Sequence, residues 1–293
     1  MQLRTGRQIH SIFRTIITII FLCFTLACTR SKSPLPAQVR VISLAPNITE
    51  IICAIGGADM LVGRTTACDF PPEIASVPYI GGFGAPSLEL LLAANPTLIL
   101  DADLEDETIA EKIRNLGLRR ERVQCVSLND IPNAIVQIGT LIHLEKNANK
   151  IATDLAENIA DLRNTAAIET NRPSVYVEIW HDPTTTIGTN TFLSEIIYLA
   201  GGGNIGDQSK IPYFQVSPEW IVSQNPDIIL CLYMAEGNKA RDSVLKRPGW
   251  QSVKAIRTAK VYDGLDNNIL LRPGPRVLDG IATIRQCILE SKQ

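Results

Sequence analysis

Two glutamates lie 130 residues apart in nearly identical stretches of sequence. Glu89 belongs to residues 86–100 and Glu219 to residues 216–230, and each stretch has a serine two positions before the glutamate, an Asn-Pro pair and a closing Ile-Leu. Two carboxylates can divide acid–base work only if they share one site. One carboxylate on each of two similar lobes instead suits docking to a partner that is itself two-fold. We therefore predict two docking posts rather than a catalytic pair.

The residues around the two glutamates predict how they are held. Ser87 and Ser217 suit helix N-caps, which places each glutamate in a first helical turn, where the helix dipole favours negative charge. The Asn-Pro pairs end both helices, and the apolar run after each pair predicts a buried parallel strand. The alternative is that both glutamates only stabilise helix ends, although that role does not require the same residue twice.

Aromatic residues gather in loops that follow predicted strands. Ligands of open α/β sheets bind outside the carboxyl ends of the strands, so two facing lobes would line the cleft between them with these rings. Such flat surfaces suit a large, partly apolar ligand better than a sugar or an amino acid. The alternative for each ring is a core role that anchors its loop. The predicted ligand-binding rings are Phe70, Phe83, Trp180, Tyr213 and Phe214.

The basic turn at residues 271–276 offers a polar contact near the start of the last helix. Arg272 is predicted to reach an acidic or amide group of a ligand, whereas Arg276 is expected to pack or pair structurally. Further polar contacts are expected from the loop around Thr189 and Asn190.

Groups for catalysis are few. After the N-terminal segment the chain has two histidines, His143 and His181, and it contains no nucleophile elbow, Walker loop or H-E-x-x-H helix. A G-x-G-x-x-G match at residues 201–206 follows a helical run instead of a strand, so it reads as a helix C-cap and turn. We predict no catalytic residue, no metal site and no enzyme activity.

Strands and helices alternate in two stretches separated by a helical one, which predicts an α/β protein with parallel sheets. The predicted lobes are residues 39–130 and 172–293, and the connector 131–171 holds a short helix and a long one that begins near Glu145. The predicted strands are 39–45, 61–64, 97–100, 122–127, 175–179 and 260–262.

The N-terminus has the pattern of an export signal. Residues 1–14 are basic, and Thr15–Ala27 is an apolar run that is too short for a membrane span. The residues before Cys28 resemble a bacterial lipobox, so residues 1–27 are predicted to be a lipoprotein signal peptide, Cys28 the acylated residue and 28–38 a tether. A plain N-terminal anchor and a soluble exported protein are the alternatives.

Five cysteines follow Cys28, so at least one thiol is free, and Cys53 and Cys68 are near enough in sequence to pair. Cys125 and Cys231 lie in apolar runs and are expected to be buried and inert. The formal net charge of −2 and the ordinary composition do not suggest a nucleic-acid partner.

Several of these motifs together resemble one family. Residues 40–50, 68–73 and 272–276, with the two repeats, are similar to the helical-backbone substrate-binding proteins of ABC importers, and most of all to the cobalamin-binding members. This family captures cobalamin, ferric siderophores or haem. The resemblance covers residues 39–290 and implies two Rossmann-like lobes joined by a single long α-helix, the class III periplasmic binding protein architecture. It also implies that Glu89 and Glu219 bind arginines of a dimeric permease.

The resemblance also bears on the ligand. Cobalamin binders carry Tyr or Trp at the positions of Phe70, Phe83 and Tyr213, so the aromatic character is kept while the hydrogen-bonding groups change. The cysteine that would pair with Cys287 is replaced by Ala200.

These observations predict a lipid-anchored extracytoplasmic protein, a monomer, that delivers a corrinoid to an ABC permease dimer with its ATPase. It would need no cofactor, because cobalamin would be its transported ligand. A ferric siderophore or haem is the alternative ligand, with Tyr213 or His181 as a possible axial group for haem. An exported α/β hydrolase that uses the same cleft is the alternative from another class.

Overall fold

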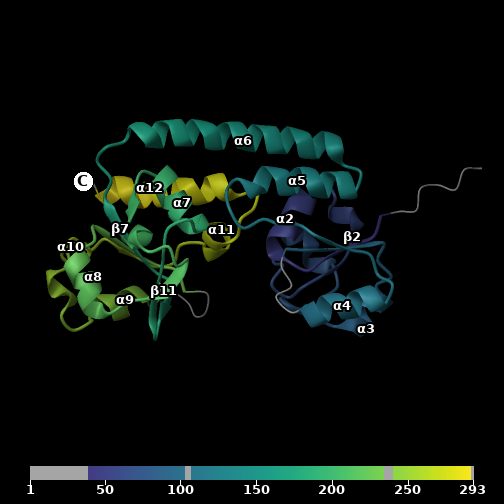
Figure 1. Ribbon diagram of the computed structural model, residues 1–293, viewed down its shortest axis with the longest axis horizontal. Helices are drawn as coiled ribbons and strands as arrows, with labels where there is room; N and C mark the ends of the chain where they lie inside the picture. Colours follow the sequence, from purple (N-terminus) through teal and green to yellow (C-terminus); the bar gives the residue numbers. More distant parts are fainter. Residues whose placement is uncertain (1–38, 103–106, 234–239, 292–293) are drawn as a thin grey trace, which may run out of the picture. The chain divides into compact units, whose positions relative to one another are not determined.

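The computed structural model describes residues 39–102, 107–233 and 240–291 (Figure 1). These residues belong to one compact unit, Val39–Gln293. The predicted signal peptide, Cys28 and the tether lie outside the described residues. Among the described residues, no helix has both the length and the apolar character needed to cross a bilayer.

The first lobe is built on a parallel four-stranded sheet in the order β2-β1-β5-β6. One boundary prediction was wrong, because the last strand lies at Arg120–Arg122 instead of 122–127. Arg120 pairs with Asp101 on the neighbouring strand, and the apolar residues Val123 and Cys125 that suggested a strand are buried after it has ended. The strands are β1 (Val41–Ser43), β2 (Leu61–Arg64), β5 (Leu98–Asp101) and β6 (Arg120–Arg122).

The second lobe repeats this plan with a parallel sheet in the order β10-β7-β12-β13. Its strands are almost wholly buried, as expected where helices cover both faces of a sheet. They are β7 (Ser174–Glu178), β10 (Gly203–Asn204), β12 (Ile228–Cys231) and β13 (Val261–Tyr262).

Two small antiparallel sheets were not predicted, and they carry most of the candidate rings. Phe83 lies in the turn between β3 (Gly81–Gly82) and β4 (Ala85–Pro86). In the second lobe, Trp180 lies in one strand and Tyr213 and Phe214 in another of a three-stranded sheet. That sheet consists of β8 (Trp180–His181), β9 (Thr184–Ile187) and β11 (Tyr213–Gln215).

The predicted long helix is α6 (Glu145–Ile168), which packs along α5 (Asp130–Leu141) and also contacts α7 (Phe192–Leu199) of the second lobe (Figure 1). Apolar residues one turn apart face the core, since Leu155 and Ile159 are buried in the largest core cluster. A Cβ atom added at Gly139 of α5 would lie 2.2 Å from the Cβ of Ala148, so the two helices approach too closely for a larger residue there.

Eight further helices lie within the described residues of the two lobes. They are α2 (Pro46–Ala54), α3 (Leu88–Ala93), α4 (Glu107–Asn115), α8 (Pro218–Gln224), α9 (Ala240–Leu245), α10 (Lys254–Arg257), α11 (Asn267–Leu271) and α12 (Val277–Ser291). Short 3₁₀ turns lie at Ala58–Met60, Pro72–Ser76, Ile205–Gln208 and Trp250–Ser252. The run at 201–206 begins with the predicted turn after α7, where Gly201 has a φ of 94°, and continues into β10 and the 3₁₀ turn at Ile205–Gln208.

Candidate functional site

The two repeats form the same local structure. The Ser87 side chain accepts a hydrogen bond from the backbone N–H of Leu90 at 3.3 Å, and Ser217 accepts one from Trp220 at 3.2 Å. Both serines are therefore N-caps, and each predicted glutamate lies in the first helical turn after its cap.

Glu89 and Glu219 are fully exposed to solvent. For both, a hydrogen bond from the backbone N–H and a second one from the capping serine lower the pKa below the ordinary value. Each glutamate is thus a fixed negative charge at neutral pH. In Figure 1 their helices, α3 and α8, both lie on the side away from α6.

An apolar cavity of about 240 Å³ lies where the two lobes meet. Tyr213 is the one predicted ring in its lining, and most of the other lining residues were not singled out from the sequence. Cys125 closes one side, because its thiol donates to the carbonyl of Pro273 at 3.2 Å, and burial raises the pKa of this thiol to about 12. The lining residues are Cys125, Val126, Ile179, Ile187, Phe192, Leu193, Tyr213, Leu270, Leu271 and Pro273.

Four of the five predicted rings are exposed. Phe83 and Tyr213 expose 60% and 62% of their surface, and Phe70 and Trp180 more than a third of theirs, so none of the four is a core anchor. The structure gives Phe214 a packing contact instead, since its ring meets that of Trp220 edge-on with 6.2 Å between centroids. Phe214 therefore supports the start of α8.

Trp180 belongs to a row of three rings that was not predicted from the sequence. His181 lies between Trp180 and Tyr233, with centroid distances of 5.4 and 5.5 Å. Tyr233 is the second residue after β12. Ligands of such sheets bind at the carboxyl ends of strands, so this position could have been predicted from the sequence.

A buried ion pair supports this row. Glu178 has no exposed surface and receives two 2.6 Å hydrogen bonds from Arg247, one from Tyr176 and one from Tyr233. Burial and the charge of Glu178 raise the pKa of Tyr233, so the phenol stays protonated and fixed. The row thus presents its exposed end, Trp180, on a rigid base.

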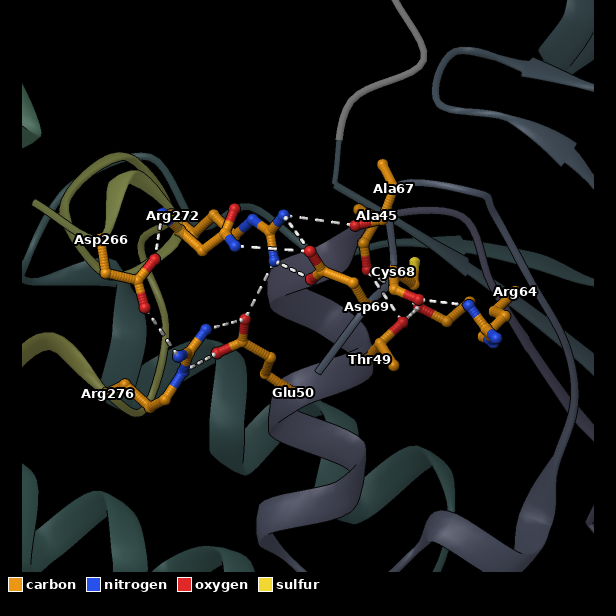
Figure 2. A network of polar contacts seen from close by, with 12 residues as sticks. Ala45, Thr49, Glu50, Arg64, Ala67, Cys68, Asp69, Asp266, Arg272 and Arg276 are labelled. Atoms are coloured by element: carbon orange, nitrogen blue, oxygen red, sulfur yellow. Dashed lines mark hydrogen bonds and ion pairs between the residues drawn. The ribbon is translucent and has the colours of Figure 1, made fainter. Parts of the chain in front are cut away.

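Arg272 and Arg276 connect the segment after α11 to the first lobe (Figure 2). Arg272 donates to Asp69 at 2.6 Å, and Arg276 donates to both oxygens of Glu50 at 2.8 and 2.7 Å. Arg276 also lies over the Phe70 ring, 3.9 Å from its centroid. The expected structural pairing of Arg276 is confirmed, and the predicted ligand arginine, Arg272, is paired as well.

The predicted polar loop at Thr189 and Asn190 does not line the apolar cavity that contains Tyr213. Thr189 and Asn190 line a second cavity of about 210 Å³, whose lining also includes Arg163, Glu195 and Asp207. Thr189 and Asn190 therefore line a different cavity from Tyr213, although all three were predicted to contact one ligand.

All five described cysteines are free, so Cys53 and Cys68 do not pair. Burial raises the pKa of the Cys231 thiol to about 12, in keeping with an inert buried cysteine. Within residues 39–102, 107–233 and 240–291, no cluster of three His, Cys, Asp or Glu side chains is placed to hold a metal ion.

Comparison with known proteins agrees with this geometry. Residues 41–267 match the family model described as periplasmic binding protein. The chain is 29% identical over 257 residues to the uncharacterized ABC transporter substrate-binding lipoprotein YvrC of Bacillus subtilis, covering 85% of this chain and 79% of that protein. It is 30% identical over 278 residues to a vitamin B12-binding protein of Vibrio cholerae, covering 92% of this chain and 96% of the relative.

Among solved structures, the fold is similar to that of the periplasmic heme-binding protein RhuT from Roseiflexus in its apo form. The TM-score is 0.76 at 28% identity, and the match covers 87% of this chain and 100% of the other. Similarity alone therefore does not choose between a corrinoid and a haem, and the choice depends on the chain's own residues.

Proposed function

We propose that this chain, which belongs to the periplasmic binding protein family, captures a corrinoid and presents it to the permease of an ABC importer. The family is one of extracytoplasmic substrate-binding transport proteins, so capture without chemical change is the premise. The corrinoid, the named contacts, the lipid anchor at Cys28 and the two docking glutamates are our proposals.

The observation that carries the ligand assignment is the pairing of exposed rings with an apolar cavity between the lobes. Tyr213 lines the cavity, and Phe70, Phe83 and Trp180 expose aromatic surface in both lobes. Aromatic faces bind a large, flat, partly apolar macrocycle well, because its burial removes much apolar surface from water.

The size of the cavity limits how such a ligand sits. At about 240 Å³ it is smaller than the roughly 300–1,000 Å³ of pockets that enclose a drug-sized ligand. A corrinoid would therefore lie across the cavity mouth, against the exposed rings, or bind with the lobes further apart.

Absorbance titration of the soluble chain with cyanocobalamin tests the assignment. We expect saturable binding with a Kd in the micromolar range or tighter, and recovery of unchanged cyanocobalamin afterwards. Tyr213→Ala should weaken binding by about tenfold, in line with the loss of one well-placed aromatic contact. No binding by the unmodified chain would refute a corrinoid, and turnover of the bound ligand would favour the hydrolase alternative.

Haem is the second candidate, because RhuT is similar in fold and sequence and because His181 and Tyr213 lie among the exposed rings. Titration with haemin separates the two. A Soret shift that His181→Ala or Tyr213→Phe abolishes would identify an axial ligand and favour haem.

A further inference from the structure

We propose that Asp69 selects ligands by charge, because it occupies Arg272 and so denies this arginine to ligand carboxylates. The inference deepens the proposed function and rests on it. It assigns to Asp69 the preference for a ligand with neutral polar groups, such as the amides of a corrinoid, over one that carries free carboxylates.

The contacts of Arg272 leave little of it for a ligand. One terminal nitrogen lies 2.6 Å from Asp69 Oδ1 and 3.5 Å from Glu50 Oε1. The other donates to the carbonyl of Ala67 at 3.3 Å and lies 3.5 Å from Asp69 Oδ2. Asp69 also accepts from the side-chain amide of Asn268 at 3.3 Å, so Asn268 holds this carboxylate together with Arg272.

The ion-paired part of the network does not attract an anion. In it, two arginines, Arg272 and Arg276, face three carboxylates, those of Glu50, Asp69 and Asp266, whereas Arg64, also drawn in Figure 2, donates to backbone carbonyls. This part of the network therefore carries a net charge of −1 when all five groups are ionised. A carboxylate that approaches it meets a like charge, whereas an amide does not.

Asp69 faces water, as does Asp266, whose side chain is 48% exposed. The Asp69 side chain is 52% exposed, while that of Glu50 is 3% exposed and holds Arg276 by two short hydrogen bonds. Neutralising Asp69 would thus remove the charged partner that lies 2.6 Å from Arg272. Arg272 would keep its longer contacts with Glu50 and Ala67, and the buried pair of Glu50 and Arg276 would not be disturbed. Arg272 is also next to the cavity, because Leu271 and Pro273, its two chain neighbours, both line it.

The loop that carries Asp69 is held by other contacts. The buried Arg64 side chain donates to the carbonyls of Cys68, Ile74 and Val77. Burial raises the pKa of Asp69, but the hydrogen bond and charge of Arg272, a hydrogen bond from the backbone and the charge of Arg276 together lower it by more, so the carboxylate is ionised at neutral pH. Asp69→Asn therefore changes a charge in a loop whose backbone Arg64 still fixes.

The test compares Asp69→Asn with Asp266→Asn, which makes the same change of charge in the same network. Asp266 lies 3.8 Å from Arg276 and makes no ion pair with Arg272, so its neutralisation leaves Arg272 occupied. The probes are haemin, which has two carboxylates, and its dimethyl ester, which has the same ring and none. Cyanocobalamin is the third probe, and absorbance titration at pH 7 gives each Kd.

We expect Asp69→Asn to tighten haemin binding by about tenfold, the size of one charge-assisted hydrogen bond, and to change the Kd of the ester and of cyanocobalamin by less than about threefold. Asp266→Asn should change haemin binding by less than about threefold. The inference is overturned if Asp69→Asn does not bind haemin more tightly than both the unmodified chain and Asp266→Asn, or if the ester gains as much as haemin.

These outcomes separate the inference from the proposed function. If the unmodified chain fails to bind cyanocobalamin, the corrinoid assignment falls, and the haemin and ester comparison still decides the role of Asp69. If cyanocobalamin binds and Asp69→Asn gains nothing for haemin, the ligand assignment stands and the charge selection is wrong.

Discussion

Helices α3 and α8 are two versions of one element, and they agree at both ends while they differ along the side. At the N-terminal end, each has a serine cap and an exposed glutamate. At the other end, Asn95 and Asn225 adopt left-handed backbone angles, with φ of 44° and 47°, just before a proline. The polar features are thus repeated in structure as well as in sequence.

The apolar sides of the two helices differ. Leu90 and Leu92 of α3 are 46% and 47% exposed. Their counterparts 130 residues later, Trp220 and Val222, are half-buried in the second core cluster, and Trp220 meets the ring of Phe214. The Phe214 ring on β11 packs against Trp220 of α8, whereas Leu90 and Leu92 of α3 remain exposed.

The comparison separates two roles within the repeat. The glutamate and its cap are the same although the packing beside them differs, so packing does not explain why the glutamate recurs. A role that requires one carboxylate on each lobe does explain it.

The largest effect is expected from removing both carboxylates. Glu89→Ala with Glu219→Ala should reduce uptake of labelled cyanocobalamin by more than about tenfold in cells that depend on this chain, because two charged docking contacts are lost. The Kd for cyanocobalamin should remain unchanged, since neither glutamate lines the cavity.

Glu157→Ala is the matched control for the double variant. Glu157 is exposed on α6, so the change removes an equally accessible carboxylate from another face. Normal uptake by the double variant, or an equal loss with Glu157→Ala, would contradict the docking role.

The next effect concerns stability and separates the two sides. Trp220→Ala should lower the free energy of unfolding by about 2 kcal/mol, because a half-buried ring loses its contact with Phe214. Leu90→Ala, at the equivalent position of α3, should change it by less than about 0.5 kcal/mol, as for an exposed side chain. Urea denaturation measures both values, and equal losses would show that α3 is packed as tightly as α8.

The serine caps should give smaller and equal effects. Ser87→Ala and Ser217→Ala should each lower the free energy of unfolding by about 1 kcal/mol, the usual loss for a helix cap. Equality is the point of this prediction, because both serines make the same bond at nearly the same length. Ser223→Ala, which alters a hydroxyl at the far end of α8, serves as control, and a difference of more than about 1 kcal/mol between the two caps would break the comparison.

The sequence predicted the repeated helices, the long α6 and both parallel sheets because each depends on local patterns. Caps, Asn-Pro pairs and apolar spacing are local signals: α3 and α8 have a serine cap and an Asn-Pro pair, whereas α6 has no side-chain cap and was predicted from its apolar spacing alone. The β6 boundary was wrong because burial of Val123 and Cys125 in the core imitates the pattern of a strand.

The contacts between distant segments could not be predicted in this way. Asp69 and Arg272 lie 203 positions apart, and nothing near either residue identifies the other as its partner. The short antiparallel sheets were missed because β3, β4 and β8 have only two residues each, which is too few for an alternating pattern. Tyr233 is different, because its place after a buried strand was a usable signal.

The smallest effect is expected from pH, and it returns to the feature that α3 and α8 share. Backbone and serine hydrogen bonds lower the pKa of Glu89 and Glu219 below the ordinary 4.5, so both stay charged as the pH falls from about 7 to 5. A lowered pKa means that the charged form is the favoured one in the fold. The charge of each glutamate is therefore present above the ordinary pKa and is lost only as the pH falls through the lowered pKa.

Binding of the soluble chain to its permease, measured by surface plasmon resonance, should change by less than about twofold between pH 7 and 5 and weaken at lower pH. The variants Glu89→Ala and Glu219→Ala, taken singly, should have the same pH profile, because the two carboxylates have the same hydrogen bonds. A fall in affinity already between pH 7 and 6 would identify a histidine as the titrating group and remove the glutamates from the contact.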